Sequence, residues 1–258
     1  MMIHTLVRAL LPEKQRIALL MTGMRLRSLT LRGKAFTCNC CGRSFRKFLP
    51  YGNQPRPNAL CPWCHSLERT RVLMAYLERE TRVFTPGTRT LHFAPEGSIL
   101  KRIKRSARPG DYIAADINPA LGEVVADITR IPYPDNSFDY VICSHVLGHV
   151  PDEPRAIDEI YRVLTPGGEA LVMTLLDLRN PVTLEDAGVT TAQERLARYG
   201  EPDLVRRHGR DFAHRLQRPG ILIEEIDYAA HMKGEERRRM STGNGERELI
   251  FRCTKVQQ

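Results

Sequence analysis

The sequence of 258 residues predicts an α/β protein with a mostly parallel, doubly wound sheet and a small cysteine-rich module before it. Two observations carry this prediction. After residue 80, short apolar strands alternate with helical stretches, which is the pattern of a parallel sheet covered by helices on both faces. Before that point, four cysteines stand in two closely spaced pairs, a spacing typical of a metal-binding ribbon.

The main domain is predicted element by element. Its clearest helix is expected at 153–164, because Ala156, Ile160 and Val163 share one face. The Pro-Gly-Gly run at 166–168 is expected to end this helix, since glycine tolerates the exit geometry. The other predicted elements are strands at 89–94, 111–117, 122–128, 138–146 and 169–176, and a helix at Gly97–Arg105.

The cysteines are the strongest local signal. They form two C-x2-C pairs separated by 19 residues, Cys38 with Cys41 and Cys61 with Cys64. Two residues between cysteines let a tight turn aim both sulfurs at one ion, and two such turns give the four thiolates that Zn²⁺ accepts. We therefore predict a structural zinc ribbon. Cys40 could substitute for a neighbouring ligand, His65 is a weaker rival, and a redox dithiol is the alternative function.

These patterns divide the chain into three parts. A basic helical segment is expected at 1–34, the zinc ribbon at 35–68 and the main α/β domain at 69–258. A helix within 64–80 should link the ribbon to the main domain. Near the C-terminus, 247–255 has the alternation of an edge strand, and 220–228 is expected to pair with it.

The net charge of +9 belongs to the N-terminal third of the chain. Residues 1–90 hold 16 Lys and Arg against 4 Asp and Glu, giving +12, whereas 91–258 hold 23 against 26, giving −3. This asymmetry suggests a nucleic acid, an anionic membrane or a phosphorylated substrate as partner, with a solvated basic face as the alternative. Since no transmembrane run or secretion signal is evident, we expect a cytoplasmic protein.

Two basic segments suggest specific partners. The ribbon loop mixes Arg and Lys with Phe45, Phe48 and Tyr51, a combination that can track RNA phosphates and stack bases. We favour the alternative, in which these aromatic residues form the core of the ribbon. Residues 1–34 are expected to form one or two short helices, the second opened by Pro12. They could make peripheral contact with an anionic membrane, although packing against the protein is favoured.

Two aspartates close predicted strands at the edge where such sheets bind ligands. Asp116 follows Ala94 by 22 residues, where a carboxylate can accept hydrogen bonds from a ribose hydroxyl pair. Asp127 closes the next strand, where a carboxylate could accept from an adenine amino group. Each alone could equally be a helix cap. Together they favour an adenosine-containing ligand.

At this point the residues resemble a family. The stretch "VVADITRIPYPDNSFDYVICSHVLGHVPDEPRAIDEIYRVLTPGGEALV" resembles the middle of a class I S-adenosylmethionine-dependent methyltransferase of the type-11 kind, and the resemblance is strong over 88–178. With the cysteine ribbon, "APE" and "TLEDAG…ERLARYGEPDLVRRHGRDF", it extends to a bacterial subgroup in which a zinc ribbon precedes the methyltransferase. It implies a Rossmann-like, seven-stranded sheet of the methyltransferase type. Members of the subgroup are often associated with surface-glycan functions.

The resemblance assigns the cofactor loop to "HFAPEGS". His92 stands where the superfamily usually has an acid, and Ala94 where it usually has a glycine. The loop is expected to bind S-adenosylmethionine through backbone N–H groups of Ala94, Glu96 and Gly97, and Glu96 is a candidate acceptor for the methionine amino group. The cofactor-binding residues implied are His92, Ala94, Glu96, Gly97, Asp116, Asp127, Ile128 and Ser144.

The sequence departs from the subgroup at two positions. The subgroup has "HVLEH" and "DHVR", whereas this chain has "HVLGH" and "DLVR". Gly148 therefore replaces an acid and Leu204 replaces a histidine. Both lost groups are polar and could face the acceptor, so the acceptor could differ or catalysis could be impaired.

Candidate catalytic residues follow the fourth strand. Methyl transfer needs orientation and, for an O–H or N–H acceptor, a general base. His145 and His149 are the candidates, with His145 preferred, although either could only cap a helix or line the pocket. A later polar group could hold a carbohydrate or phosphorylated acceptor, or could form a salt-bridged surface helix. It comprises Tyr199, Asp203, Arg206, His208 and Asp211.

We therefore predict an S-adenosylmethionine-dependent methyltransferase with structural Zn²⁺, acting on a glycan precursor or another small molecule. The first alternative is an rRNA or tRNA methyltransferase that grips RNA through the basic ribbon. The stretch "CSHV" stands where base N-methylation would have an "NPPY"-like or "DPPY"-like signature, which lowers that alternative. The second alternative is a non-catalytic relative that serves as a binding module.

Overall fold

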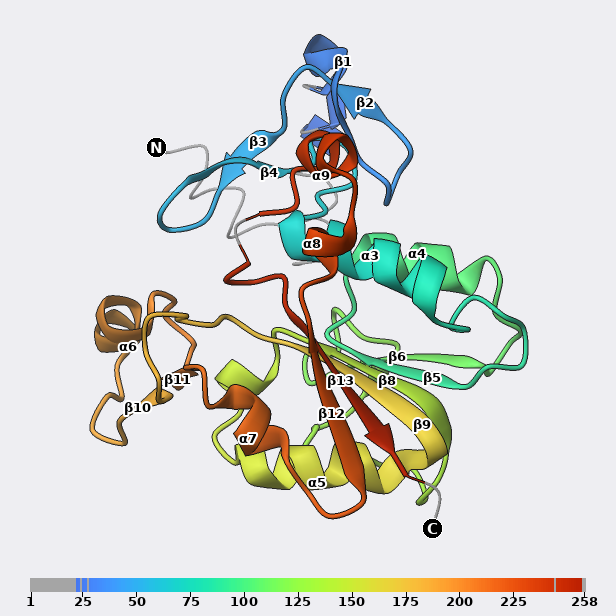
Figure 1. The fold of residues 1–258 in the computed structure, drawn as a ribbon, viewed down its shortest axis with the longest axis vertical. Helices are drawn as coiled ribbons and strands as arrows, with labels where there is room; N and C mark the ends of the chain where they lie inside the picture. Colours follow the sequence, from blue (N-terminus) through green and yellow to red (C-terminus); the bar gives the residue numbers. More distant parts are fainter. Residues whose placement is uncertain (1–21, 24, 27, 244, 257–258) are drawn as a thin grey trace.

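A computed structural model describes residues 22–256 except 24, 27 and 244. Its main strands are β5 (Thr90–Phe93), β6 (Tyr112–Asp116), β7 (Val124–Val125), β8 (Phe138–Ser144), β9 (Leu164–Met173), β12 (Ile221–Ile226) and β13 (Ile250–Lys255). They form one seven-stranded sheet in the order β12-β13-β9-β8-β5-β6-β7 (Figure 1). Pairing is parallel from β7 to β9, and β13 is antiparallel to both of its neighbours. This arrangement confirms the predicted Rossmann-like fold class.

Helices cover both faces of the sheet. The first face packs on α5 (Glu153–Val163) and α7 (Phe212–Leu216). The other face packs on α3 (Glu68–Glu80), α4 (Gly97–Lys104), α8 (Tyr228–His231) and α9 (Gly234–Met240). Every residue of β5 is buried, as expected for a parallel strand with a helical layer on each side.

Some element boundaries differ from the sequence prediction. The helix α5 ends at Val163, and β9 begins directly at Leu164, so the run at 166–168 lies in the strand and does not terminate the helix. The register between β8 and β9 shifts at this point. The C-terminal strand β13 was expected at the edge of the sheet, but it lies between β12 and β9. The sequence showed the alternation of apolar and polar residues in β13, but not that β12 would form the edge of the sheet beyond it.

The cysteine module contains four short strands and its own small core. After the 3-10 helix η1 (Leu29–Leu31), the strands are β1 (Arg32–Thr37), β2 (Ser44–Phe45), β3 (Leu49–Tyr51) and β4 (Arg56–Leu60). Phe45 and Phe48 are buried beside Leu31, which confirms that these aromatic rings form the core of the module. Tyr51 is exposed. The three-part division of the chain stays a prediction, and β1 begins within the segment expected at 1–34.

Arg71 of α3 joins the cysteine module to the main domain. Its side chain is fully buried and lies over the ring of Phe48. The guanidinium donates to the carbonyl oxygens of Ser66 and Ala59 on one side, and of Met240 and Ser241 on the other. Because every bond ends on a backbone carbonyl, Arg71 fixes the position of the module over α3 and α9.

A third unit projects beside the sheet (Figure 1). It contains β10 (Leu184–Glu185), β11 (Arg206–Arg207) and α6 (Ala192–Tyr199), and it contacts the 3-10 helix η2 (Leu147–His149) that follows β8. Within the described residues, no helix is both long enough and apolar enough to cross a membrane. The helix expected to open at Pro12 lies outside the described residues.

Candidate functional site

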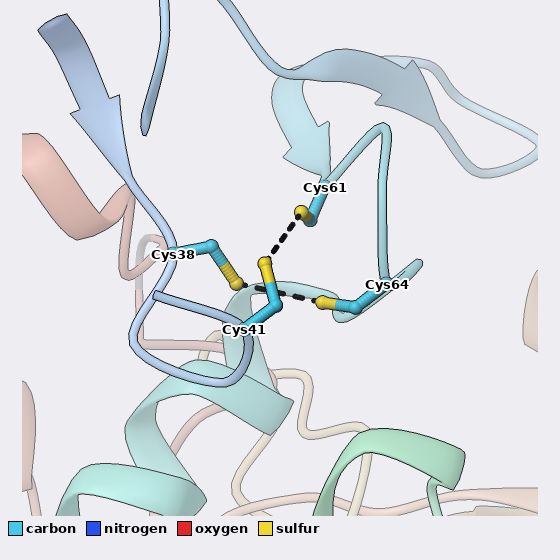
Figure 2. Close-up of side chains that lie close together, drawn as sticks. All are labelled: Cys38, Cys41, Cys61 and Cys64. Atoms are coloured by element: carbon cyan, nitrogen blue, oxygen red, sulfur yellow. Dashed lines mark hydrogen bonds between the residues drawn. The ribbon is translucent and has the colours of Figure 1, made fainter. Parts of the chain in front are cut away.

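The four predicted zinc ligands converge. Figure 2 shows the side chains of Cys38, Cys41, Cys61 and Cys64 pointing toward one another. Their sulfur atoms all lie within 4.8 Å of one another, with 3.5 Å between Cys38 and Cys64 and 3.9 Å between Cys41 and Cys61. Zn–S bonds of about 2.3 Å place the corners of a tetrahedral cage about 3.8 Å apart. The cluster therefore has the donor chemistry and the spacing for zinc.

The two cysteine turns are built alike. In the first, the Gly42 N–H donates to the Cys38 carbonyl at 2.7 Å; in the second, the His65 N–H donates to the Cys61 carbonyl at 3.0 Å. Both donors have a positive φ, +70° at Gly42 and +61° at His65. The turn therefore favours glycine at this position. Ser66 then places its hydroxyl 3.1 Å from the Cys38 sulfur, where it can steady a thiolate.

The rival ligands stay outside the cluster. Cys40 turns its sulfur to the Thr70 carbonyl at 3.7 Å, and His65 is not part of the cluster. Hydrogen bonds with the Cys38 thiol raise the pKa values of Cys41 and Cys61 above their ordinary range. Four thiols this close cannot all ionise without a cation among them, which is the role that a divalent metal fills.

The predicted cofactor loop leaves the buried end of β5 and turns into α4. Ala94 adopts a φ of +46°, which explains physically why glycine is usual at this position. Its N–H donates to the Ala115 carbonyl at 2.9 Å and is therefore not available for a ligand, contrary to the expectation. Glu96 and Gly97 begin α4, where backbone N–H groups lack helical partners. A Cβ atom at Gly97 would meet nothing within 4 Å, so the space before this turn is open.

Glu96 is held in one orientation by two side chains. The Nε2–H of His92 donates to one carboxylate oxygen at 3.1 Å, and Ser144 donates to the other at 2.8 Å. His92 is fully buried, and its Nδ1 accepts from the hydroxyl of Tyr112 at 2.9 Å. Burial alone would raise the pKa of Glu96, but the hydrogen bond from His92 holds it below its ordinary value. A fixed carboxylate therefore lies close to where the superfamily has its acid.

Asp116 and Asp127 lie farther along the same sheet edge. One oxygen of Asp116 accepts the Asn118 N–H at 2.8 Å, and one oxygen of Asp127 accepts both the N–H and the hydroxyl of Thr129 at 2.8 Å. Neither caps a helix among the described residues; each braces its own turn through a single oxygen. Ile128 has its side chain in the main core, so only its backbone can face a ligand.

His145 follows β8 directly and lies at the same edge. Its φ is +57°, a conformation that non-glycine residues rarely adopt and that is enriched at functional sites. The Nε2–H donates to the Arg247 carbonyl at 3.0 Å, which leaves the lone pair on Nδ1. Burial, followed by the charge of Arg69, lowers the pKa of His145 well below its ordinary value. The ring is therefore neutral near pH 7.

A small cavity of about 70 Å³ lies between His145 and the projecting unit. We call it the acceptor pocket, and it is lined by Arg69, His145, Gly148, His149, Thr174, Leu175, Glu201, Leu204 and Arg247. Of these, the sequence singled out only the two histidines, Gly148 and Leu204. Thr174 could have been found because it follows the end of β9. Arg69, Glu201 and Arg247 come from distant segments and had no local signal.

The two departures from the subgroup pattern are in direct contact. A Cβ atom at Gly148 would lie 2.8 Å from Cδ2 of Leu204, which is tighter than side chains tolerate. Leu204 is buried beside Leu175 and Tyr199. The two positions therefore adjoin in space, and the Leu204 side chain covers the backbone at Gly148. His149 also lines the pocket, and its Nδ1 lies 3.4 Å from a carboxylate oxygen of Asp203.

The later polar group does not form a surface helix. Arg206 is buried and donates to the carbonyl oxygens of Leu147, Val150 and Pro151 and to the Glu185 carboxylate. His208 donates to Glu153 at 2.6 Å and accepts from Thr174 at 2.8 Å. These residues attach the projecting unit to η2 and α5, so they are structural. Of this polar group, only Asp203 approaches the acceptor pocket, by its contact with His149. Tyr199 and Asp211 bond within the unit, to Asp186 and Thr183.

A larger cavity of about 780 Å³ lies elsewhere, between the cysteine module and α9. Its lining includes Phe36, Arg56 and the run 237–239, and it shares no lining residue with the acceptor pocket. His145 and His149, the candidate bases, line the smaller pocket and not this one.

Comparisons with known proteins agree with the fold. Residues 91–172 match the family described as Methyltransferase domain. The ubiquinone/menaquinone biosynthesis C-methyltransferase UbiE of Hydrogenovibrio crunogenus is 34% identical over 116 residues, covering 38% of this chain and 46% of that protein. The 2-phytyl-1,4-naphtoquinone methyltransferase of Nostoc punctiforme is 38% identical over 63 residues, covering 24% and 27%. The chain thus spans less than half the length of these two relatives.

Among solved structures, the [4+2]-cyclase SpnF is 16% identical with a TM-score of 0.49, covering 95% of this chain and 97% of that one. An S-adenosylmethionine dependent methyltransferase from Mesorhizobium loti is also 16% identical with a TM-score of 0.49, covering 74% and 99%. The strand order is that of the Rossmann-like methyltransferase fold, and the match to the methyltransferase domain family covers residues 91–172.

Proposed function

We propose that the protein is an S-adenosylmethionine-dependent methyltransferase acting on a small-molecule acceptor. One observation carries the proposal: the Glu96 carboxylate is fixed by His92 and Ser144 at the carboxyl edge of the sheet. Asp116 at the end of β6 and Asp127 just after β7 lie on one side of it. The acceptor pocket lies on the other side, where the chain leaves β8 and β9. This is the division that a nucleoside donor and a separate acceptor require.

The cofactor-binding roles follow from this arrangement. Glu96 would accept from the amino group of the methionine part, and His92 and Ser144 keep its carboxylate ionised and oriented. Asp116 would hold the ribose and Asp127 the adenine, each through its second carboxylate oxygen. Ala94 and Gly97 keep the loop open, and Ile128 would contribute only backbone. When bound, the cofactor supplies a sulfonium methyl group for in-line displacement.

We assign the general base to His145. Its hydrogen bond to the Arg247 carbonyl selects the tautomer in which Nδ1 can take a proton. Because burial lowers its pKa well below 6.5, the neutral form persists as the pH falls, and kcat/KM should hold down to clearly below that pH. A pH–rate profile tests this. An acid limb at pH 6.5 or above would contradict the assignment of the base to His145.

The acceptor class is a narrower question. The relatives are named for quinone biosynthesis, so phenolic and quinol compounds are the first acceptors to assay. A glycan-precursor acceptor remains our prediction from the subgroup resemblance. RNA is disfavoured because Phe45 and Phe48, two of the three aromatic residues offered for base stacking, are buried. The unit that covers the acceptor pocket lies outside the matched residues 91–172, so the relatives do not determine the acceptor.

We propose Zn²⁺ at Cys38, Cys41, Cys61 and Cys64, with a structural role, since all four positions are taken by protein sulfur. Purified protein should contain one zinc per chain, and Cys61→Ser should lose most of it. The matched control is Cys40→Ser, whose sulfur lies outside the cluster and which should retain the metal. Equal zinc content in both variants would contradict zinc binding by these four cysteines.

The proposed function is tested by calorimetric titration of S-adenosylmethionine and S-adenosylhomocysteine into the zinc-loaded protein. We expect micromolar binding, weakened at least about tenfold in Asp116→Ala through loss of charge-assisted hydrogen bonds. Asp158→Ala, an exposed change on α5, is the control. Absence of binding by either ligand to folded protein would contradict the enzyme proposal and favour a binding module.

A further inference from the structure

One guanidinium in the acceptor pocket has a nitrogen without a hydrogen-bond partner among the described residues. Arg69 lies in the first turn of α3, five residues after Cys64, and its side chain lines the pocket. The Nε atom of its guanidinium is buried and has no hydrogen-bond partner among the described residues. No salt bridge to Arg69 occurs within the described part of the chain either. A buried donor left without a partner is costly, and a ligand that accepts from this nitrogen would complete it.

The rest of the pocket does not neutralise this charge. Arg247 also lines the pocket and pairs with Glu201 at 3.2 Å, so that carboxylate is already engaged. Burial and the neighbouring charge of Arg247 lower the pKa of Arg69, which Glu96 only partly offsets. His145 is neutral and adds no negative charge. The lining therefore carries two guanidinium groups against one carboxylate.

Apart from Glu201, no carboxylate among the described residues lines the pocket. The Thr174 hydroxyl already donates to His208, and His149 is a further lining residue. A volume of about 70 Å³ admits one small group, not a whole substrate. Guanidinium groups recognise carboxylate and phosphate through charge-assisted, often bidentate hydrogen bonds.

We infer that Arg69 and Arg247 form an anion-binding site that receives a carboxylate or phosphate group beside His145. The inference rests on the proposed function, and it narrows the acceptor to anionic small molecules. Two molecules could supply the anion: the acceptor, or the amino-acid part of the cofactor. The acceptor is favoured as the source. The pocket lies where the chain leaves β8 and β9, whereas Asp116 and Asp127 lie on the other side of β5 in the sheet.

The test uses the full chain with inorganic phosphate as the probe. Phosphate is titrated calorimetrically into the protein alone and into its S-adenosylhomocysteine complex. S-adenosylhomocysteine is compared with methylthioadenosine, which lacks the amino-acid part. The variants are Arg69→Met and Arg247→Met, and the matched control is Arg79→Met, an exposed arginine on the same helix. Arg69→Met should fold, because methionine keeps an unbranched apolar stem and removes only the guanidinium.

Each outcome decides something. Phosphate binding to the S-adenosylhomocysteine complex that falls at least about tenfold in Arg69→Met, but not in Arg79→Met, supports the site with the acceptor as source. A similar loss for S-adenosylhomocysteine but not for methylthioadenosine supports it with the cofactor as source. If phosphate binds neither form and Arg69→Met binds S-adenosylhomocysteine normally, the anion site is wrong. If no nucleoside binds but phosphate binding still depends on Arg69, the proposed function fails and the anion site stands.

Discussion

Two groups of polar side chains meet at Thr174, and they differ in how completely their polar atoms are hydrogen-bonded. The anchor cluster, formed by Glu153, Arg206 and His208, has its charged and ring nitrogen atoms paired. The acceptor pocket has an Arg69 nitrogen without a partner and a strained His145. Buried polar groups normally stabilise a fold only when they are satisfied. The difference indicates that the anchor cluster holds the structure and that the pocket is completed by a ligand.

The largest expected effect comes from breaking the anchor cluster. Arg206→Met leaves three carbonyl oxygens without their donor and releases Glu185. We expect a loss of about 3 kcal/mol or more in the free energy of unfolding, measured in urea. Arg198→Met on the exposed face of α6 is the control and should change stability by less than about 0.5 kcal/mol. A loss below about 1 kcal/mol for Arg206→Met would show that the cluster is not an anchor.

The contact between Gly148 and Leu204 should give the next largest effect. Leu204→Ala should cost about 2–4 kcal/mol because it opens a cavity. Gly148→Ala should cost about 1–2 kcal/mol because the new methyl group meets Leu204 at 2.8 Å. The double variant should cost at least about 0.5 kcal/mol less than the sum, since the smaller residue at 204 relieves the clash. Strict additivity in a denaturant series would mean that the two departures are independent.

A smaller effect on stability should come from the protonation of His208. Burial lowers its pKa below the ordinary 6.5, so below that pH the unfolded chain binds a proton that the folded chain excludes. Stability should therefore fall as the pH decreases from 6.5, by at most about 1.4 kcal/mol per pH unit from this residue. In His208→Gln, the contribution of this residue to the change of stability with pH should disappear. Glu153, whose pKa is lowered, adds its own loss only at more acidic pH.

Unfolding curves measured from pH 7.5 to 5 provide the comparison. Wild type and His208→Gln should converge at the acidic end and differ most at the neutral end. Parallel pH dependences would mean that folding leaves the pKa of His208 unchanged. A wild type that gains stability relative to the variant as the pH falls would mean that His208 is protonated in the folded protein and forms an ion pair with Glu153.

Local patterns predicted much of the fold. The apolar strands, the face of α5 and the spacing of the cysteine pairs each depend on residues close in sequence, and the structure confirms the sheet and the convergence of the sulfurs. Boundaries were less accurate where tertiary contacts decide them. The strand β9 extends back to Leu164 because β8 is there to pair with it.

The site was predicted only in part, because its key contacts join distant segments. The sequence named Glu96 as a candidate but could not show that Ser144, 48 residues later, would hold it. It treated Gly148 and Leu204 as separate losses, although they touch. It grouped Arg206 and His208 with acceptor-binding residues because both are polar, whereas their burial makes them structural. Arg69 resembled any arginine on an amphipathic helix.

The central claim is that the edge around Glu96 binds the cofactor and that the pocket beside it binds an anion. A crystal structure of the zinc-loaded protein with S-adenosylhomocysteine and phosphate tests both parts. We predict the ribose at Asp116, the amino group at Glu96, and phosphate within hydrogen-bond distance of Arg69 and Arg247. Nucleoside density elsewhere on the molecule, or Glu96 unchanged with no ligand at this edge under saturating conditions, would contradict the account.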